Sequence, residues 1–304
     1  MAAGRLTGGA RVLIVLNPAA GQRHRQRLGG LLAALAARGV TAEVRATRHP
    51  GEAVAIARDA VRAGTSLVVA AGGDGTVAEV VNGLLAGPAA APRPALGILP
   101  LGTANVLAHE LAIPASPAAL ADLLVRRSTR PIWPGVLEQA GQRRYFVQMV
   151  GAGFDADVVR RVSRPLKRRI GGLAYAWQGL VEALHYPFPQ IEVSLDGVAT
   201  TTHGVIVSKG QLYAGRYRLA PDASPLHSGF SAVLFDRPGA LSVLASGLAL
   251  PLGQVLRLPG VRALPARRAI VSVGAAPVQA DGDPAGVGGF EVTACDRSID
   301  VVMP

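Results

Sequence analysis

The sequence predicts an α/β fold: an N-terminal domain with a doubly wound parallel sheet, followed by a mainly antiparallel, sandwich-like β domain. Three observations support this prediction. Apolar runs alternate with helix-length segments through about the first 110 residues, loops rich in glycine or asparagine follow three of these runs, and strand patterns dominate after about residue 131. Since 304 residues can build two hydrophobic cores, we place the domains at residues 1–131 and 132–304.

The first domain reads as four strand–helix units with short connections, a pattern typical of a parallel sheet. We expect strands at residues 11–16, 41–46, 67–71 and 95–99, and helices at residues 28–38, 51–64, 77–85 and from the next loop to 111. The carboxyl ends of parallel strands share one edge of the sheet, where ligands bind. Asn17-Pro18, Gly72–Thr76 and Gly102–Asn105 each follow a strand, so we expect these three loops to meet there.

The loop Gly72-Gly73-Asp74-Gly75-Thr76 is the most informative stretch. A buried strand, a glycine turn and a helix start form a geometry that binds phosphate through main-chain N–H groups, and we expect Thr76 to cap the helix. The Asp74 carboxylate would repel a bare phosphate, so it suggests a bound Mg²⁺ shared with substrate phosphates. The loop matches neither GxxxxGK[ST] nor GxGxxG, and a structural turn that needs glycine is the alternative.

The second domain begins after a group of prolines, at positions 114, 117, 131 and 134. Its expected strands are residues 135–138, 144–150, 190–195, 204–208, 230–235, 270–273, 278–280 and 289–294. One long helical segment, residues 170–185, interrupts them. Basic residues at 160–169 precede an apolar and aromatic stretch at 171–177, so we expect residues 170–185 to contact an anionic membrane surface. A solvated basic loop is the alternative interpretation of residues 160–169.

The net charge of +11 fits nucleic acid, an anionic membrane or an anionic substrate such as ATP. No basic helix with interleaved aromatic residues is visible, so we expect no nucleic-acid partner. The only cysteine, Cys295, cannot form an internal disulfide and fits a reducing cytosol. The most apolar stretch, residues 241–256, is shorter than the ~20 residues of a membrane span. We therefore expect a cytoplasmic protein that touches a membrane peripherally, and we leave monomer and homodimer open.

An ordered set of motifs resembles the diacylglycerol kinase catalytic family, which includes bacterial diacylglycerol kinase-like and sphingosine kinase-like lipid kinases. The matching segments begin at residue 17 and end at residue 283: Asn17-Pro18-x-x-Gly21, Gly72–Thr76, Leu101–Asn105, Gly153-Phe154-Asp155-Ala156, Ala220-Pro221-Asp222-Ala223 and Gln279-x-Asp281-Gly282-Asp283. The glycine–aspartate loop alone also occurs in NAD kinases and phosphofructokinase-like enzymes.

This resemblance implies ATP- and Mg²⁺-dependent phosphorylation of a lipid hydroxyl, such as that of diacylglycerol, with the nucleotide between the two domains. It implies nucleotide-binding roles for residues of the three loops: Asn17, Pro18, Gly72, Gly73, Asp74, Gly75, Thr76, Gly102, Thr103 and Asn105. Asp74 would hold Mg²⁺ and contribute to catalysis. The late motif would supply the proton acceptor, Asp283, with Asp281 beside it.

Three positions depart from the family pattern. Asp283 stands where members commonly have Glu, which moves a general base by one methylene. Ser228 stands where several members have an aspartate of a structural metal site, and Val106 stands where Asp is frequent.

Several alternatives remain open. The segment 151–156 fits G-x-G-x-x-A, but the acidic residue that a dinucleotide-binding site needs about 20 positions later is missing, so we interpret it as a turn at a domain hinge. Asp281-Gly282 is also a hairpin-turn signal. The rival functions are a non-catalytic nucleotide or lipid sensor with the kinase fold and a NAD kinase-like enzyme.

Overall fold

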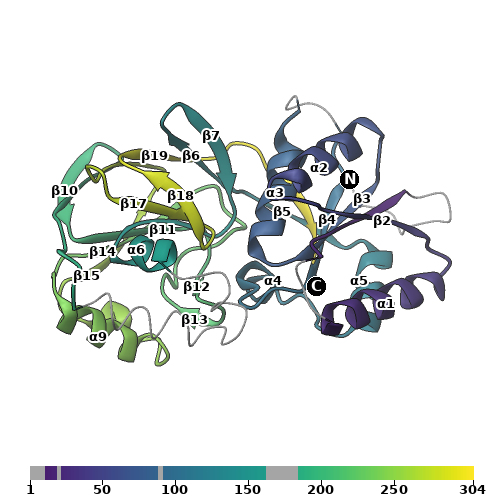
Figure 1. The fold of residues 1–304 in the computed structure, drawn as a ribbon, viewed down its shortest axis with the longest axis horizontal. Helices are drawn as coiled ribbons and strands as arrows, with labels where there is room; N and C mark the ends of the chain where they lie inside the picture. The colour runs from purple at the N-terminus through teal and green to yellow at the C-terminus, as the bar shows by residue number, and fades with distance from the viewer. Residues whose placement is uncertain (1–10, 19–21, 88–91, 162–183) are drawn as a thin grey trace. The chain divides into compact units, whose positions relative to one another are not determined.

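The computed structural model describes residues 11–18, 22–87, 92–161 and 184–304 of the chain. These residues form two compact units (Figure 1). Unit 1 comprises residues up to 133 together with residues 297–304, and unit 2 comprises residues 134–296. The end of the chain thus belongs to unit 1, whereas the sequence-based boundary assigned it to the second domain.

Unit 1 is built on a six-stranded sheet in the order β2-β1-β3-β4-β20-β5. Its strands are β1 (Val12–Leu16), β2 (Ala42–Ala46), β3 (Leu67–Gly72), β4 (Ala95–Pro100), β5 (Thr129–Ile132) and β20 (Ile299–Val302). All neighbours in this sheet are parallel except β20 and β5. The apolar runs of β3 and β4 are buried along their whole length, as central strands covered on both faces require.

Helices cover the two faces of this sheet: α2 and α3 pack together on one face, and α1 and α5 on the other (Figure 1). The helices of unit 1 are α1 (Gln22–Ala36), α2 (Glu52–Arg62), α3 (Asp74–Leu85), α4 (Val106–Glu110) and α5 (Pro117–Arg126). The predicted doubly wound architecture is therefore confirmed.

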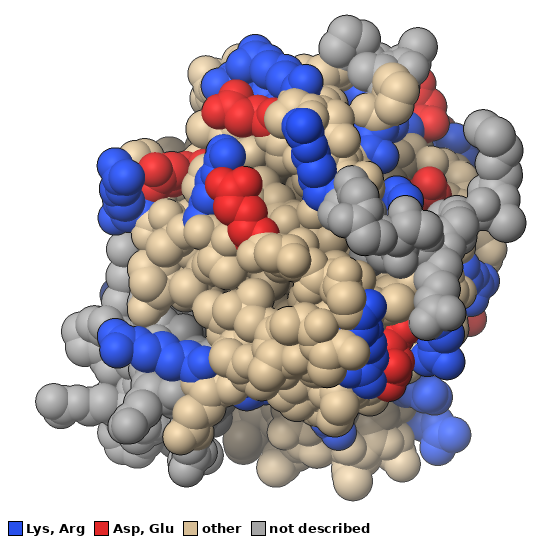
Figure 2. All heavy atoms as spheres, turned by 90° about the vertical axis from the view of Figure 1, so that its right-hand side faces the viewer, with Lys and Arg blue, Asp and Glu red and all other residues tan. Residues whose placement is uncertain are grey.

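On the face drawn in Figure 2, basic and acidic side chains lie beside one another around a broad area without charged side chains.

Unit 2 contains two six-stranded antiparallel sheets, in the orders β10-β9-β16-β19-β6-β7 and β15-β14-β11-β8-β17-β18. The strands of the first are β6 (Gly135–Gln139), β7 (Gln142–Phe146), β9 (Ile191–Leu195), β10 (Val198–Thr202), β16 (Arg268–Ser272) and β19 (Phe290–Ala294). Those of the second are β8 (Met149–Gly153), β11 (Gly204–Ser208), β14 (Phe230–Phe235), β15 (Val261–Ala266), β17 (Pro277–Ala280) and β18 (Asp283–Val287).

Alternate side chains of both sheets fill one buried cluster, which includes Phe146, Val150, Val193, Val207 and Val292. This is the packing of a β-sandwich, and it confirms the predicted antiparallel β domain. The shorter elements are β12 (Leu212–Tyr213), β13 (Tyr217–Arg218), α6 (Phe154–Arg161), α9 (Ala240–Ala249) and the 3₁₀ turn η1 (Val255–Arg257).

Two expectations about local structure need correction. The strand expected at residues 144–150 is two strands, β7 and β8, which belong to different sheets. The helix cap expected at Thr76 is instead Gly73, because α3 already begins at Asp74. The expected helix and membrane contact at 170–185 lies almost entirely outside the described residues, as does Gly21.

Candidate functional site

The turn between β3 and α3 exposes main-chain donors. Gly73 is extended at the N-cap position, with φ −92° and ψ −171°, and no side chain caps the helix. A helix start without a side-chain cap leaves N–H groups of its first turn available to an anion. Gly72 must lack a side chain, because a Cβ there would lie 2.3 Å from Oγ1 of the buried Thr76.

The loop after β4 is folded by Asn105, whose main chain is left-handed with φ 47°. Its Oδ1 accepts a hydrogen bond from the Gly102 N–H, and its Nδ2 donates to the Gly102 carbonyl, both at 2.7 Å. A Cβ on Gly102 would lie 2.5 Å from the Cα of Gly73. The two glycine loops therefore touch backbone to backbone, and Thr103, which follows Gly102 in the second loop, is exposed.

Side chains fasten the three loops to one another. Oδ1 of Asp74 accepts a hydrogen bond from the Leu107 N–H at 3.2 Å, so this carboxylate lies at the start of α4. Asn17 Nδ2 donates to Thr76 Oγ1 at 3.2 Å, and the Asn17 N–H donates to the Ala71 carbonyl at 2.9 Å. The structure thus brings together the loops that follow β1, β3 and β4, while Pro18 is exposed beside them.

Burial raises the pKa of Asp74, and the main-chain N–H groups of Val106 and Leu107 oppose that rise. In the described part of the chain no group of three or more His, Cys, Asp or Glu side chains could hold a metal. A single carboxylate is still compatible with Mg²⁺, which commonly takes one or two carboxylates and completes its shell with phosphate oxygens and water. Asp74 therefore fits a Mg·nucleotide site but not a metal site made by protein alone.

In unit 2, the turn between β17 and β18 is anchored by Asp281, which has a left-handed main chain with φ 51°. Its carboxylate accepts hydrogen bonds from three successive N–H groups: Val147 at 3.0 Å, Gln148 at 2.7 Å and Met149 at 3.1 Å. These are the residues at which the chain crosses from β7 in one sheet to β8 in the other. Asp281 thus supplies an acceptor for the main-chain N–H groups at this crossing.

A second carboxylate, Asp155 at the start of α6, is linked to the same turn. Its Oδ1 accepts a hydrogen bond from the Tyr213 hydroxyl, and its Oδ2 accepts one from Gln279 Nε2 at 2.9 Å. Oε1 of Gln279 in turn accepts the Gly282 N–H at 3.1 Å. Burial raises the pKa of Asp155, and both hydrogen bonds oppose the rise. The motifs at 153–156 and 279–283 are therefore neighbours.

Asp283, in contrast, is exposed at the first position of β18. Arg144 lies within electrostatic reach of the turn: burial lowers the pKa of its guanidinium, while Asp281 and Asp283 raise it. The pattern that identified the late motif gave no sign of Arg144 or Tyr213, because neither belongs to a recurring local sequence.

Lys209 is another residue that the sequence did not single out. It is fully buried, and its ammonium donates to the main-chain carbonyls of His227, Ser228 and Gly229. The Ser228 hydroxyl accepts a hydrogen bond from Arg267 Nη1 at 2.9 Å. At the position where the family pattern would place a metal-site aspartate, this loop is therefore held by a lysine and an arginine, and Asp222 is exposed.

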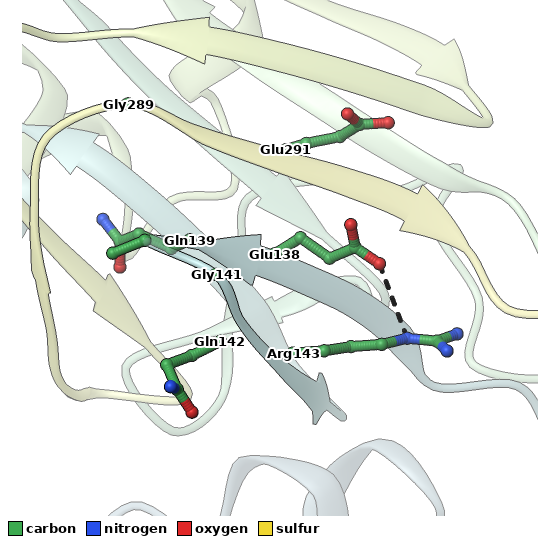
Figure 3. A pocket seen from close by; sticks show the side chains of 8 residues that line it. Glu138, Gln139, Gly141, Gln142, Arg143, Gly289 and Glu291 are labelled. Carbon is green, nitrogen blue, oxygen red and sulfur yellow. Dashed lines mark ion pairs between the residues drawn. The ribbon is translucent and has the colours of Figure 1, made fainter.

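A hollow of about 480 Å³ lies over the β6–β7 hairpin and shares no residue with these motifs (Figure 3). Its walls carry Glu138 and Arg143, which form an ion pair at 3.5 Å, and Glu291, which pairs with Arg268 at 2.7 Å. The ion pairs are solvent-exposed, and such pairs stabilise little. We assign no ligand to this hollow.

Two family models match most of the chain. The model of the diacylglycerol kinase catalytic domain matches residues 11–136, and that of the YegS C-terminal NAD kinase beta sandwich-like domain matches residues 148–303. A diacylglycerol kinase from Bacillus subtilis is 29% identical over 97% of this chain and 96% of its own length. A probable lipid kinase YegS-like protein from Chromohalobacter salexigens is 41% identical, but the match covers 47% of this chain and 44% of that protein.

Solved structures show the same fold. The crystal structure of a diacylglycerol kinase from Bacillus anthracis superposes with a TM-score of 0.70 at 18% identity, and the match covers 97% of each chain.

Proposed function

The chain belongs to the lipid kinase family in which a diacylglycerol kinase catalytic domain precedes a YegS C-terminal NAD kinase beta sandwich-like domain, and on that basis we propose that it transfers a phosphoryl group from Mg·ATP to a hydroxyl of a membrane lipid. Diacylglycerol is the first acceptor to test, because the Bacillus subtilis relative is a diacylglycerol kinase.

The observation that carries the proposal is the fastening of three loops at the carboxyl edge of the sheet in unit 1. In phosphoryl transfer the protein mainly positions groups and neutralises charge. We propose that the N–H groups of the Gly72–Thr76 and Gly102–Asn105 loops bind the phosphates, with Asn17 and Pro18 completing the site. Asn17 also holds Thr76 in place through the 3.2 Å hydrogen bond.

Asp74 would hold the Mg²⁺ that accompanies ATP. An ion held there would supply positive charge that offsets the charge of the phosphates. The 3.2 Å bond from Leu107 orients the Asp74 carboxylate, and burial disfavours its charged form. A cation offsets that cost, so we expect nucleotide affinity to depend on Mg²⁺ through Asp74.

We propose that Asp283 accepts the proton of the lipid hydroxyl, since it is the exposed carboxylate of the late motif. Asp281 lies two residues away but directs its carboxylate at three main-chain N–H groups. Its contribution would be to fix the turn from which Asp283 projects. General-base catalysis typically contributes about 10²–10⁴-fold to a rate.

The test is ATP turnover with a panel of dispersed lipid alcohols, measured for the wild type, Asp74→Asn and Asp283→Asn. A lipid kinase should turn over with at least one lipid, and Asp74→Asn should lose nearly all of that turnover, because the proposed Mg²⁺ carboxylate is removed. Nucleotide binding without turnover would favour a sensor, and turnover with NAD in the absence of lipid would favour a NAD kinase-like enzyme. Either result would overturn the proposal.

A further inference from the structure

Helix α9 presents an unusually apolar surface to solvent. Leu241, Leu244 and Leu248 are 82%, 50% and 67% exposed, and Leu252 just beyond the helix is 71% exposed. Their spacing of three and four residues places them on one helix face. Figure 1 shows α9 at the edge of unit 2, next to β15.

The opposite side of this segment is firmly attached to unit 2. Ala249 and Val255 are buried in a cluster with Met149, Ile206 and Val233, and Leu250 packs against that cluster. The C-terminal end of α9 is thus anchored in the core of unit 2, and the leucines on its other face remain exposed to solvent.

Within the segment that contains α9, the charged residues are of one sign. Residues 237–260 contain no Asp or Glu, and exposed arginines, Arg237 and Arg257, stand at the two ends of the apolar stretch. The nearest acidic residue in sequence, Asp236, is paired with Arg262 at 2.7 Å. An apolar face flanked by arginines complements a bilayer with anionic headgroups, to which each Lys or Arg near the surface adds about 1 kcal/mol.

The length of α9 determines whether it could span a bilayer or only lie at its surface. Ten residues of helix extend about 15 Å, half of the ~30 Å hydrocarbon core. No helix among the described residues is long and apolar enough to cross a bilayer. A helix of this length can lie in the interface plane with its exposed leucines inserted among the lipids.

We propose that the leucine face of α9, flanked by Arg237 and Arg257, docks this protein on an anionic lipid bilayer. The inference extends the proposed function, because a kinase of membrane lipids has to work at a bilayer surface. It can be tested separately, since vesicle binding needs neither nucleotide nor turnover.

The experiment is co-sedimentation of the full chain with vesicles of phosphatidylcholine alone and of phosphatidylcholine mixed with phosphatidylglycerol. Leu241→Ser/Leu248→Ser should weaken binding to both kinds of vesicle by about 30-fold. Arg237→Gln/Arg257→Gln should weaken binding by about 30-fold only where phosphatidylglycerol is present. Val198→Ser is the control, because Val198 is 72% exposed on β10, outside α9, and it should bind like the wild type.

The proposal is overturned if the wild type does not bind the mixed vesicles, or if the leucine variant binds as well as the wild type. It is also overturned if Leu241→Ser/Leu248→Ser turns a dimer into a monomer in analytical ultracentrifugation while vesicle binding persists, since a second copy would then cover α9. Turnover on a short-chain lipid that needs no bilayer should survive both double variants. Absence of that turnover in the wild type would count against the kinase activity and not against docking.

Discussion

The sharpest prediction concerns the two carboxylates of the β17–β18 turn, which the sequence placed together as catalytic and the structure places in different surroundings. Asp281→Ala removes the acceptor for three N–H groups, those of Val147, Gln148 and Met149 at 2.7–3.1 Å. Hydrogen bonds to a charged group are each worth about 1.5–3 kcal/mol, and an unpaired buried donor costs about 1–3 kcal/mol. Since Asp281 is partly exposed, we take the lower end of that range.

We therefore expect Asp281→Ala to lower the free energy of unfolding by about 4 kcal/mol. In a domain of this size each kcal/mol lowers the melting temperature by about 2–4 °C, so the shift should be about 10 °C. Asp281→Asn retains one acceptor oxygen and should lose about half as much. Urea denaturation, followed by tryptophan fluorescence and circular dichroism, measures the free energy.

The matched comparison is Asp283→Asn, which should leave the urea midpoint unchanged and lower ATP turnover by about 10²–10⁴-fold. Asp222→Ala, at another exposed aspartate, should alter neither quantity. If Asp281→Ala unfolds within about 0.5 kcal/mol of the wild type, as surface substitutions usually do, the anchoring argument is wrong. An Asp281→Ala protein that is stable but inactive would show that Asp281 takes part in the chemistry.

Two further predictions follow from close packing and from burial. Gly102→Ala should abolish nucleotide binding measured by calorimetry, because its Cβ would lie 2.5 Å from the Cα of Gly73, whereas Gly29→Ala, with open space on α1, should stabilise the protein by up to about 1 kcal/mol. Burial lowers the pKa of Lys209 from 10.5 to about 8. Between these pH values the unfolded chain binds more protons than the folded one, so stability should rise with pH by up to about 3 kcal/mol. Lys209→Met should flatten that part of the urea-midpoint profile against pH, and an unchanged slope would contradict the assignment.

Much of unit 1 could be predicted from local sequence. The strands of a parallel sheet are continuous apolar runs, and the rule that their carboxyl ends share an edge was sufficient to bring Asn17, Asp74 and Asn105 to one place. What local patterns could not show is the detail of contact: the Asp74 carboxylate faces the start of α4, and Gly102 touches Gly73. Both depend on the packing of segments about 30 residues apart.

Unit 2 was harder to predict, because many of its antiparallel strands pair with strands that are far away in the sequence. Residues 144–150 have the pattern of a single strand in the sequence, and nothing local shows that the chain changes sheet at Val147 and Gln148. Asp281, whose carboxylate accepts hydrogen bonds from the main-chain N–H groups at this crossing, lies about 130 residues later in the sequence. Lys209 is similar, since a single lysine after a buried strand carries no signal of the three carbonyls it meets.

The return of the last strand to unit 1 has a consequence for how the protein is made. β20 inserts between β4 and β5, with Val301 beside Leu96 and fully buried. During translation the amino-terminal half therefore leaves the ribosome with a gap in its sheet, and the gap closes only after the whole of unit 2 has been synthesised. Until then the edge of β4 offers unpaired main-chain groups to any other strand, which is the kind of edge at which chains aggregate.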